Sequence, residues 1–106
     1  MKKKCVPCEG NIRAVSKRNA GDRLKELPQW RLSGDGKSIF SEHRVKDFAK
    51  AVRLIGRIAR LAEKEGHHPD LHLTGYRRLK VELSTHAIGG LSENDFLLAA
   101  KIDSFF

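Results

Sequence analysis

Histidines gather in one short part of this sequence of 106 residues. Four of the five lie between Gly66 and Ala87, and two of them, His67 and His68, are adjacent. An imidazole in a short peptide has a pKa of about 6.5, so such side chains can donate and accept protons near neutral pH. The stretch holds no cysteine and no serine in a nucleophile-elbow motif. The pattern therefore favours proton transfer over covalent catalysis.

Two carboxylates are placed to support these histidines. Glu63 lies one helical turn before His67, where it could hold an imidazole in one tautomer and raise its basicity. Asp95 follows the pair Gly89-Gly90, and a turn at these glycines could bring it to the same place.

The last histidine is expected near the first two. Residues 71–83 alternate as two strands around a turn, which predicts an antiparallel hairpin. The start of the first strand of a hairpin lies beside the end of the second. We therefore expect His86 close to His67 and His68.

A zinc site is the main alternative reading of the same region. Its plausible ligands are Glu63, His67, His68, His72 and His86. His68 and His72 have the i,i+4 spacing of a helical ligand pair. Pro69 disfavours helix at His68, and strand-like alternation follows it, so His72 should point elsewhere. We favour acid–base chemistry and expect no metal.

The elements that must position these residues centre on one long helix, expected from about Asp47 to Glu65. Apolar residues recur there at steps of three and four, as in a helix packed on a core. The face expected to meet the core carries Phe48, Val52, Ile55, Ala59 and Ala62, widened by Ala51 and Ile58. Gly66 suits the left-handed conformation that ends a helix.

Shorter elements flank the long helix. We expect a helix from Asn19 or Gly21 to Leu27, strands at 30–32, 39–45, 71–74 and 79–83, and a last helix capped by Ser92 and Asp95. This order predicts an α+β fold, a four-stranded antiparallel sheet with three helices packed on one face. The other face would carry His72, Thr74, Lys80, Glu82 and Ser84, in contact with solvent or with another subunit.

Charge and composition limit the function classes. The net charge is +8, but the basic residues are scattered and no aromatic residues alternate with them, so we do not expect nucleic-acid binding. No apolar run approaches the roughly 20 residues of a membrane helix, and none follows Lys2–Lys4 as in a signal peptide. We expect a cytoplasmic protein, or one in an organelle if a transit peptide has been removed.

The N-terminus is expected to form a basic extension over residues 1–18, followed by one domain over residues 19–106. Cys5 and Cys8 in this extension have the spacing of half a zinc site or of a redox pair. A structural zinc site needs four ligands, and the sequence has no second cysteine pair. We favour an extension that packs on the domain or frays.

The chemical residues also occur in an order that resembles a known family. Glu63, His67-His68-Pro69, Tyr76, His86 and Asp95 resemble the signature of the pterin-4a-carbinolamine dehydratases. The segments 84–86 and 90–95 are similar to the family's second motif, and the opening Cys-Val-Pro-Cys-Glu-Gly resembles one subgroup. The resemblance covers roughly Leu24 to Asp103.

This resemblance implies an activity and a set of roles. The substrate would be a 4a-hydroxytetrahydropterin, the product a quinonoid dihydropterin, and no metal or organic cofactor would be needed. His68 and His86 would act as acid and base, and His67 would position the ring. Glu63 and Asp95 would support them, and substrate contacts would come from Pro69, Ser84, Thr85 and Ala87.

The resemblance also implies partners. It predicts a homodimer or tetramer and a functional link to an aromatic amino acid hydroxylase, which forms the substrate. A second function class is a coactivator that stabilises a homeodomain transcription factor dimer. A third is a paralogue that works in folate or molybdopterin metabolism.

Overall fold

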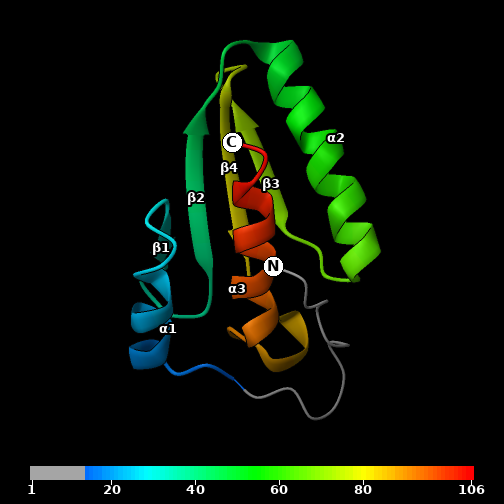
Figure 1. Ribbon diagram of the computed structural model, residues 1–106. Coiled ribbons are helices and arrows are strands. Elements are labelled where there is room, and N and C mark those ends of the chain that lie inside the picture. The colour runs from blue at the N-terminus through cyan, green and yellow to red at the C-terminus, as the bar shows by residue number, and fades with distance from the viewer. Residues whose placement is uncertain (1–13) are drawn as a thin grey trace.

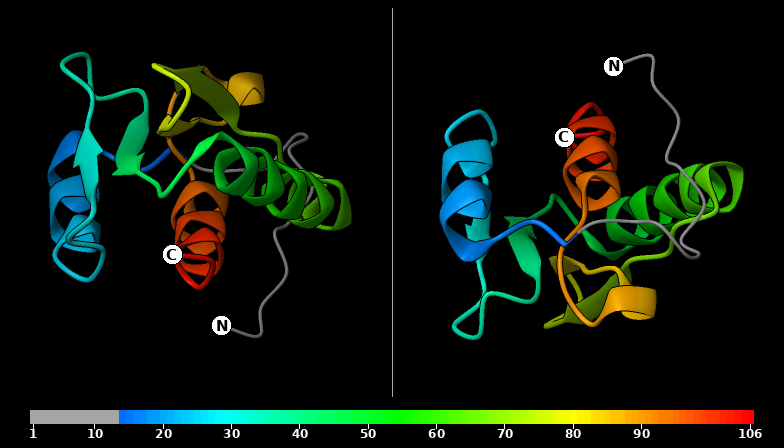
Figure 2. Two further views of the ribbon diagram at one scale, coloured as in Figure 1. Left: turned by 90° about the horizontal axis from the view of Figure 1, so that it is seen from above. Right: turned by 90° about the horizontal axis from the view of Figure 1, so that it is seen from below.

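One antiparallel sheet forms a layer of the molecule, and three helices cover one of its faces (Figures 1 and 2). The structure is a computed structural model and describes residues 14–106. Its elements are α1 (Lys17–Leu24), β1 (Trp30–Leu32), β2 (Ile39–Arg44), α2 (Phe48–Glu65), β3 (Asp70–Thr74), β4 (Arg78–Leu83), the short 3₁₀ helix η1 (His86–Ile88) and α3 (Glu93–Asp103). The expected α+β fold is confirmed.

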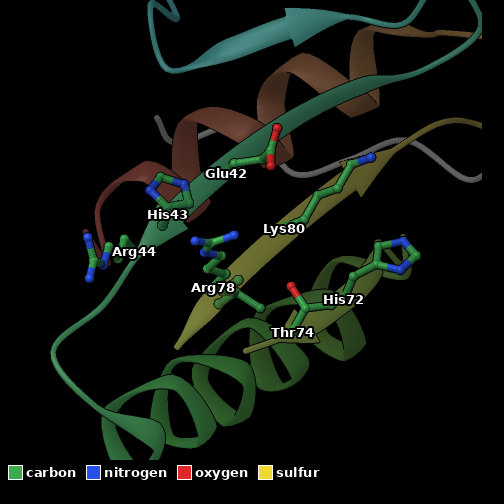
Figure 3. Close-up of a pocket in the computed structure, with 8 residues that line it drawn as sticks. Glu42, His43, Arg44, His72, Thr74, Arg78 and Lys80 are labelled. Carbon is green, nitrogen blue, oxygen red and sulfur yellow. The ribbon is translucent and has the colours of Figure 1, made fainter. Parts of the chain in front are cut away.

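Two hairpins are joined through their inner strands in the order β1-β2-β4-β3. Six residue pairs connect β2 and β4, from Ile39 opposite Leu83 to Arg44 opposite Arg78. Successive side chains of a strand point to opposite faces, so alternate residues of the sheet face the helices. The other face is polar and carries no helix, and Figure 3 looks onto it.

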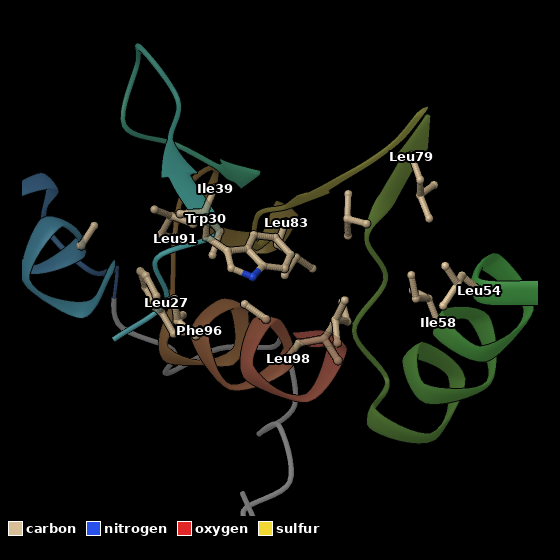
Figure 4. Close-up of a cluster of buried hydrophobic side chains, with 14 of the residues drawn as sticks. Leu27, Trp30, Ile39, Leu54, Ile58, Leu79, Leu83, Leu91, Phe96 and Leu98 are labelled. Atoms are coloured by element: carbon tan, nitrogen blue, oxygen red, sulfur yellow. The ribbon is translucent and has the colours of Figure 1, made fainter. Parts of the chain in front are cut away.

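Side chains from every layer meet in one core between the sheet and the helices (Figure 4). Helix α3 runs through its middle, where Phe96, Leu98 and Ile102 are buried. The indole N–H of Trp30, on the edge strand β1, donates to Oδ1 of Asp103 at 2.8 Å. This bond ties the edge of the sheet to the end of α3.

Helix α2 begins and ends as the sequence predicts, but its buried face is shifted, because Ala51, Ile58 and Ala62 are buried as predicted and other predicted positions are not. Asp47 caps it by accepting from the Lys50 N–H at 2.8 Å, and Gly66 ends it with a φ of 67°. The buried residues are Ala51, Leu54, Ile58, Ala62 and Glu65. The apolar arc of α2 is broad, and only the packing of α3 and the sheet selects which of its edges is buried.

Three predicted core positions at the other edge of that arc, Phe48, Val52 and Ala59, were therefore wrong, whereas Ile55 packs against the core. Phe48 is 55% exposed and Val52 is 47% exposed, while Ala59 is exposed and Ile55 is half-buried. Within residues 14–106, no helix is both long and apolar enough to cross a membrane.

The first helix begins earlier than the sequence analysis predicts. Ser16 caps α1, which starts at Lys17, because the Ser16 side chain accepts from the Asn19 N–H. The Val15 N–H donates to the Leu91 carbonyl at 2.7 Å, so the chain is already tied to the domain before α1. The predictions for Cys5 and Cys8 fall outside the described residues.

His43 makes the stability of this fold depend on pH. Its ring stacks on Phe106 with centroids 3.7 Å apart. Burial lowers the pKa of His43 below 6.5, although Asp103 opposes this effect. The unfolded chain therefore binds the proton more readily, so stability is retained above this pKa range and is lost as the pH falls from about 6.5. We expect His43→Gln to lose less thermal stability than the unaltered protein between pH 7.5 and 5, measured by circular dichroism. Equal losses in the two proteins would contradict this account.

Candidate active site

Three segments meet at one end of the sheet, beyond the start of β3 and the end of β4. Asp70 pairs with Glu82, so the residues just before β3 lie beside those just after β4. The first segment is the end of α2 with the loop that holds His67 and His68. The second is the turn from Thr85 through η1, and the third is the start of α3 with Asp95.

A buried histidine–carboxylate pair forms the centre of this site. Nε2 of His67 lies 2.6 Å from Oδ1 of Asp95, and the two residues are 4% and 0% exposed. The same aspartate is the acidic member of the Ser92–Asp95 capping box of α3. Its Oδ2 accepts from the Ser92 N–H at 2.9 Å. The helix cap therefore orients the carboxylate that holds the histidine.

Thr85 completes this network through its side chain. Its hydroxyl donates to Oδ2 of Asp95 at 2.8 Å and lies 2.6 Å from the Ser92 hydroxyl. Its backbone N–H donates to the Gly90 carbonyl, and its carbonyl accepts from the Ile88 and Gly90 N–H groups. The backbone N–H and carbonyl of Thr85, a residue for which the resemblance implies substrate contact, are both hydrogen-bonded within the turn.

Glu63 pairs with His68 and not with the buried histidine. Oε2 of Glu63 is hydrogen-bonded to Nε2 of His68, and the side chains are 75% and 63% exposed. Glu63 therefore lies beside the imidazole of His68, while the carboxylate beside His67 is that of Asp95. The reason is the left-handed turn at Gly66, which directs the two adjacent histidines to different surroundings.

His86 and the remaining predicted residues surround the network. His86 is exposed in η1, and it directly follows Thr85, so its Cα lies about 3.8 Å from that of Thr85. Pro69 and Ser84 are half-buried, and Ala87 is exposed. Two histidines of the site thus face solvent while the third is held in the interior.

His72, the fifth residue of the zinc alternative, lies apart from the site. It belongs to the open face of β3, where its Nε2 is 3.8 Å from Oε1 of Glu82. In the part of the chain that the structure describes, no three histidine, cysteine, aspartate or glutamate side chains form a group that could hold a metal ion.

Ser92 is the one member of the network that sequence reasoning placed only as a helix cap. Its hydroxyl lies within hydrogen-bond distance of Thr85, seven residues earlier in the chain. The signal that could have found it is the capping box itself. In this structure Ser92 and Asp95 of that box are both fully buried.

The fold and this site together define an α+β protein with a buried histidine–carboxylate pair at one end of its sheet. Comparison with known proteins names it: residues 13–105 match the family model described as Pterin 4 alpha carbinolamine dehydratase. The chain belongs to this family.

Individual relatives agree with the family assignment. The chain is 49% identical over 104 residues to "Pterin-4-alpha-carbinolamine dehydratase 2, mitochondrial" of Arabidopsis thaliana, covering 95% of this chain and 56% of that protein. It is 40% identical over 102 residues to a protein of Halorhodospira halophila, covering 96% and 93% of the two chains. A Brucella melitensis crystal structure, described as a transcriptional coactivator/pterin dehydratase, superposes with a TM-score of 0.81 at 28% identity, covering 88% and 98% of the two chains.

Proposed function

We propose that this protein dehydrates a 4a-hydroxytetrahydropterin to the quinonoid dihydropterin by histidine acid–base catalysis. The observation that carries the proposal is the arrangement of the three histidines. His67 is held in the interior by Asp95, while His68, its neighbour in the chain, and His86, which directly follows Thr85, are exposed. Membership of the dehydratase family supplies the class of substrate.

The reaction needs two proton movements. The bond between C4a and the hydroxyl oxygen breaks as an acid protonates that oxygen, and water leaves. The electrons of the N5–H bond form the C4a–N5 double bond as a base accepts the N5 proton. One positioned acid or base typically contributes about 10²–10⁴-fold in rate.

Exposure divides the roles among the histidines. His68 and His86 can reach a bound pterin from the solvent side, so we assign them to the acid and the base. The Glu63 carboxylate is hydrogen-bonded to Nε2 of His68 and would hold its imidazole in one orientation toward the substrate. His67 is 4% exposed and would act as a positioning residue for the pterin ring.

The test is direct. Freshly generated 4a-hydroxytetrahydropterin would be followed by absorbance with the full chain in the presence of EDTA. Rapid, chelator-resistant dehydration is expected. Activity that EDTA abolishes and zinc restores would move the histidines into a metal site, and a folded but inactive protein would favour the coactivator alternative.

The exposed face of α2 supports self-association, which we propose as a dimer or tetramer of this chain. Phe48 and Val52 project from one side of the helix and remain exposed beside Ala59. Burial of such side chains contributes about 1.5–3 kcal/mol each. We also propose that an aromatic amino acid hydroxylase supplies the substrate. The mitochondrial name of the Arabidopsis relative supports location in an organelle.

Phe48→Asp is expected to lower the molar mass in solution without unfolding the chain, because it places a charge in the centre of this contact. Light scattering coupled to size-exclusion chromatography would measure it. Ala49→Asp is the matched control, since the exposed Ala49 lies about 100° away round the helix. An unchanged mass for Phe48→Asp, or an equal effect of both variants, would exclude this face as the interface.

A further inference from the structure

A hollow of about 590 Å³ lies on the open face of the sheet, away from the active site. The dehydratase proposal makes no use of it. Apart from His43 and Leu79, its lining forms a grid of two rows across β2, β4 and β3 (Figure 3), and these residues are Arg44, Arg78, Thr74, Glu42, Lys80 and His72. It occupies the end of the sheet where β3 turns into β4, whereas His67 and Thr85 belong to the opposite end and to the covered side.

The outer row of the grid is suited to bind an anion. Arg44 is the register partner of Arg78, which is in turn the partner of Thr74. Opposite residues of an antiparallel pair have Cβ atoms about 4.5–5.5 Å apart. Two guanidinium groups and a hydroxyl therefore lie within reach of one bound group, and each guanidinium can donate two parallel hydrogen bonds to phosphate oxygens.

The inner row lies about 7 Å farther along the strands, two residues away. It adds Lys80, with Glu42 and His72 as its partners. The lining thus holds three permanent cations and one carboxylate. The Lys80 ammonium lies 4.8 Å from the ring centroid of Phe40 on the same face.

These arginines have no internal charge partner. Within residues 14–106, no carboxylate oxygen lies within 4.0 Å of the guanidinium nitrogens of Arg44 or Arg78. Like charges directly opposite each other on neighbouring strands are destabilising. An anion bound between Arg44 and Arg78 would neutralise part of their charge and reduce this repulsion, and it would therefore stabilise the folded protein.

We propose that this hollow binds a small phosphorylated organic molecule, with its phosphate between Arg44, Arg78 and Thr74. The volume is within the range of small-molecule sites, about 300–1,000 Å³. The two planar guanidinium groups favour phosphate over a single carboxylate. Each guanidinium can bind two oxygens, whereas one carboxylate has only two oxygens and is satisfied by one guanidinium. Lys80 and His72 would contact the rest of the molecule. The site is independent of the proposed dehydration.

The test is isothermal titration calorimetry of the full chain with inorganic pyrophosphate and with O-phosphoserine, at constant ionic strength. Saturable binding of both is expected. Arg78→Gln should weaken it at least about tenfold, the loss of one charged hydrogen-bonding group. Arg31→Gln is the matched control, because Arg31 is exposed on the same face of the sheet but lies outside the hollow, and it should weaken binding less than about twofold.

Several outcomes would overturn the proposal. Equal weakening by Arg78→Gln and Arg31→Gln would show attraction to general surface charge. Citrate binding as tightly as pyrophosphate would remove the preference for phosphate, and an oligonucleotide binding far more tightly would assign the face to a nucleic-acid backbone. Misfolding is checked in the same samples, since relief of the Arg44–Arg78 repulsion predicts that Arg78→Gln melts at the same temperature as the unaltered protein or higher.

Discussion

Replacing His86 by alanine is expected to lower kcat for dehydration by about 10²–10⁴-fold, the contribution of one positioned acid or base. His86 is exposed in η1, and its side chain makes no hydrogen bond within residues 14–106, so its loss should leave stability nearly unchanged. Stopped-flow absorbance with freshly generated 4a-hydroxytetrahydropterin would measure the rate. His68→Ala should give a loss of similar size.

Chemical rescue separates a catalytic role from a structural one. Free imidazole added to His86→Ala should restore part of the rate, because it can transfer the missing proton from solution. Lys46→Ala is the control, an exposed change in the loop at the other end of the sheet, and it should retain the full rate. Full activity in His86→Ala would remove this residue from the mechanism.

Replacing Asp95 by alanine is expected to reduce the free energy of unfolding by about 3–5 kcal/mol, as when one member of a buried pair is removed. The substitution leaves the His67 ring, the Thr85 hydroxyl and the Ser92 N–H without their common acceptor in a fully buried place. It also removes the acidic half of the α3 capping box. Urea denaturation followed by circular dichroism would measure the loss.

An exposed pair in the same site provides the comparison. Glu63→Ala removes the carboxylate partner of His68, and solvent-exposed pairs typically contribute only about 0–1 kcal/mol. If Asp95→Ala and Glu63→Ala reduced the free energy of unfolding by comparable amounts, burial of the Asp95 network would not explain its contribution to stability. A double-mutant cycle between Asp95→Ala and His67→Ala would give the energy of that pair, and a value near zero would exclude Asp95 as the residue that fixes His67.

Much of the fold was encoded in short stretches of sequence. Asp47, Gly66 and the Ser92–Asp95 box act on the backbone within four residues, so the bounds of α2 and the start of α3 could be predicted. Strand alternation likewise gave the two hairpins and their order along the chain.

The sequence named the candidate site residues but not how they pair. Antiparallel pairing predicted that His86 lies near His67 and His68, and a turn at Gly89-Gly90 was expected to bring Asp95 to the same place. The sequence could not show that Asp95 binds His67 while Glu63 binds His68. That choice depends on how α3 approaches the end of α2, a contact between residues 28 positions apart.

What the sequence by itself determined is therefore the set of elements, their caps and the residues that carry chemistry. Only the tertiary structure decided which edge of the α2 arc is buried, leaving Phe48 exposed, and that Arg44 lies opposite Arg78. The physical reason is the separation in sequence over which each interaction acts. Caps, turns and alternation are local interactions, whereas helix burial and the β2–β4 register result from contacts between distant segments, whose relative free energies no local pattern contains.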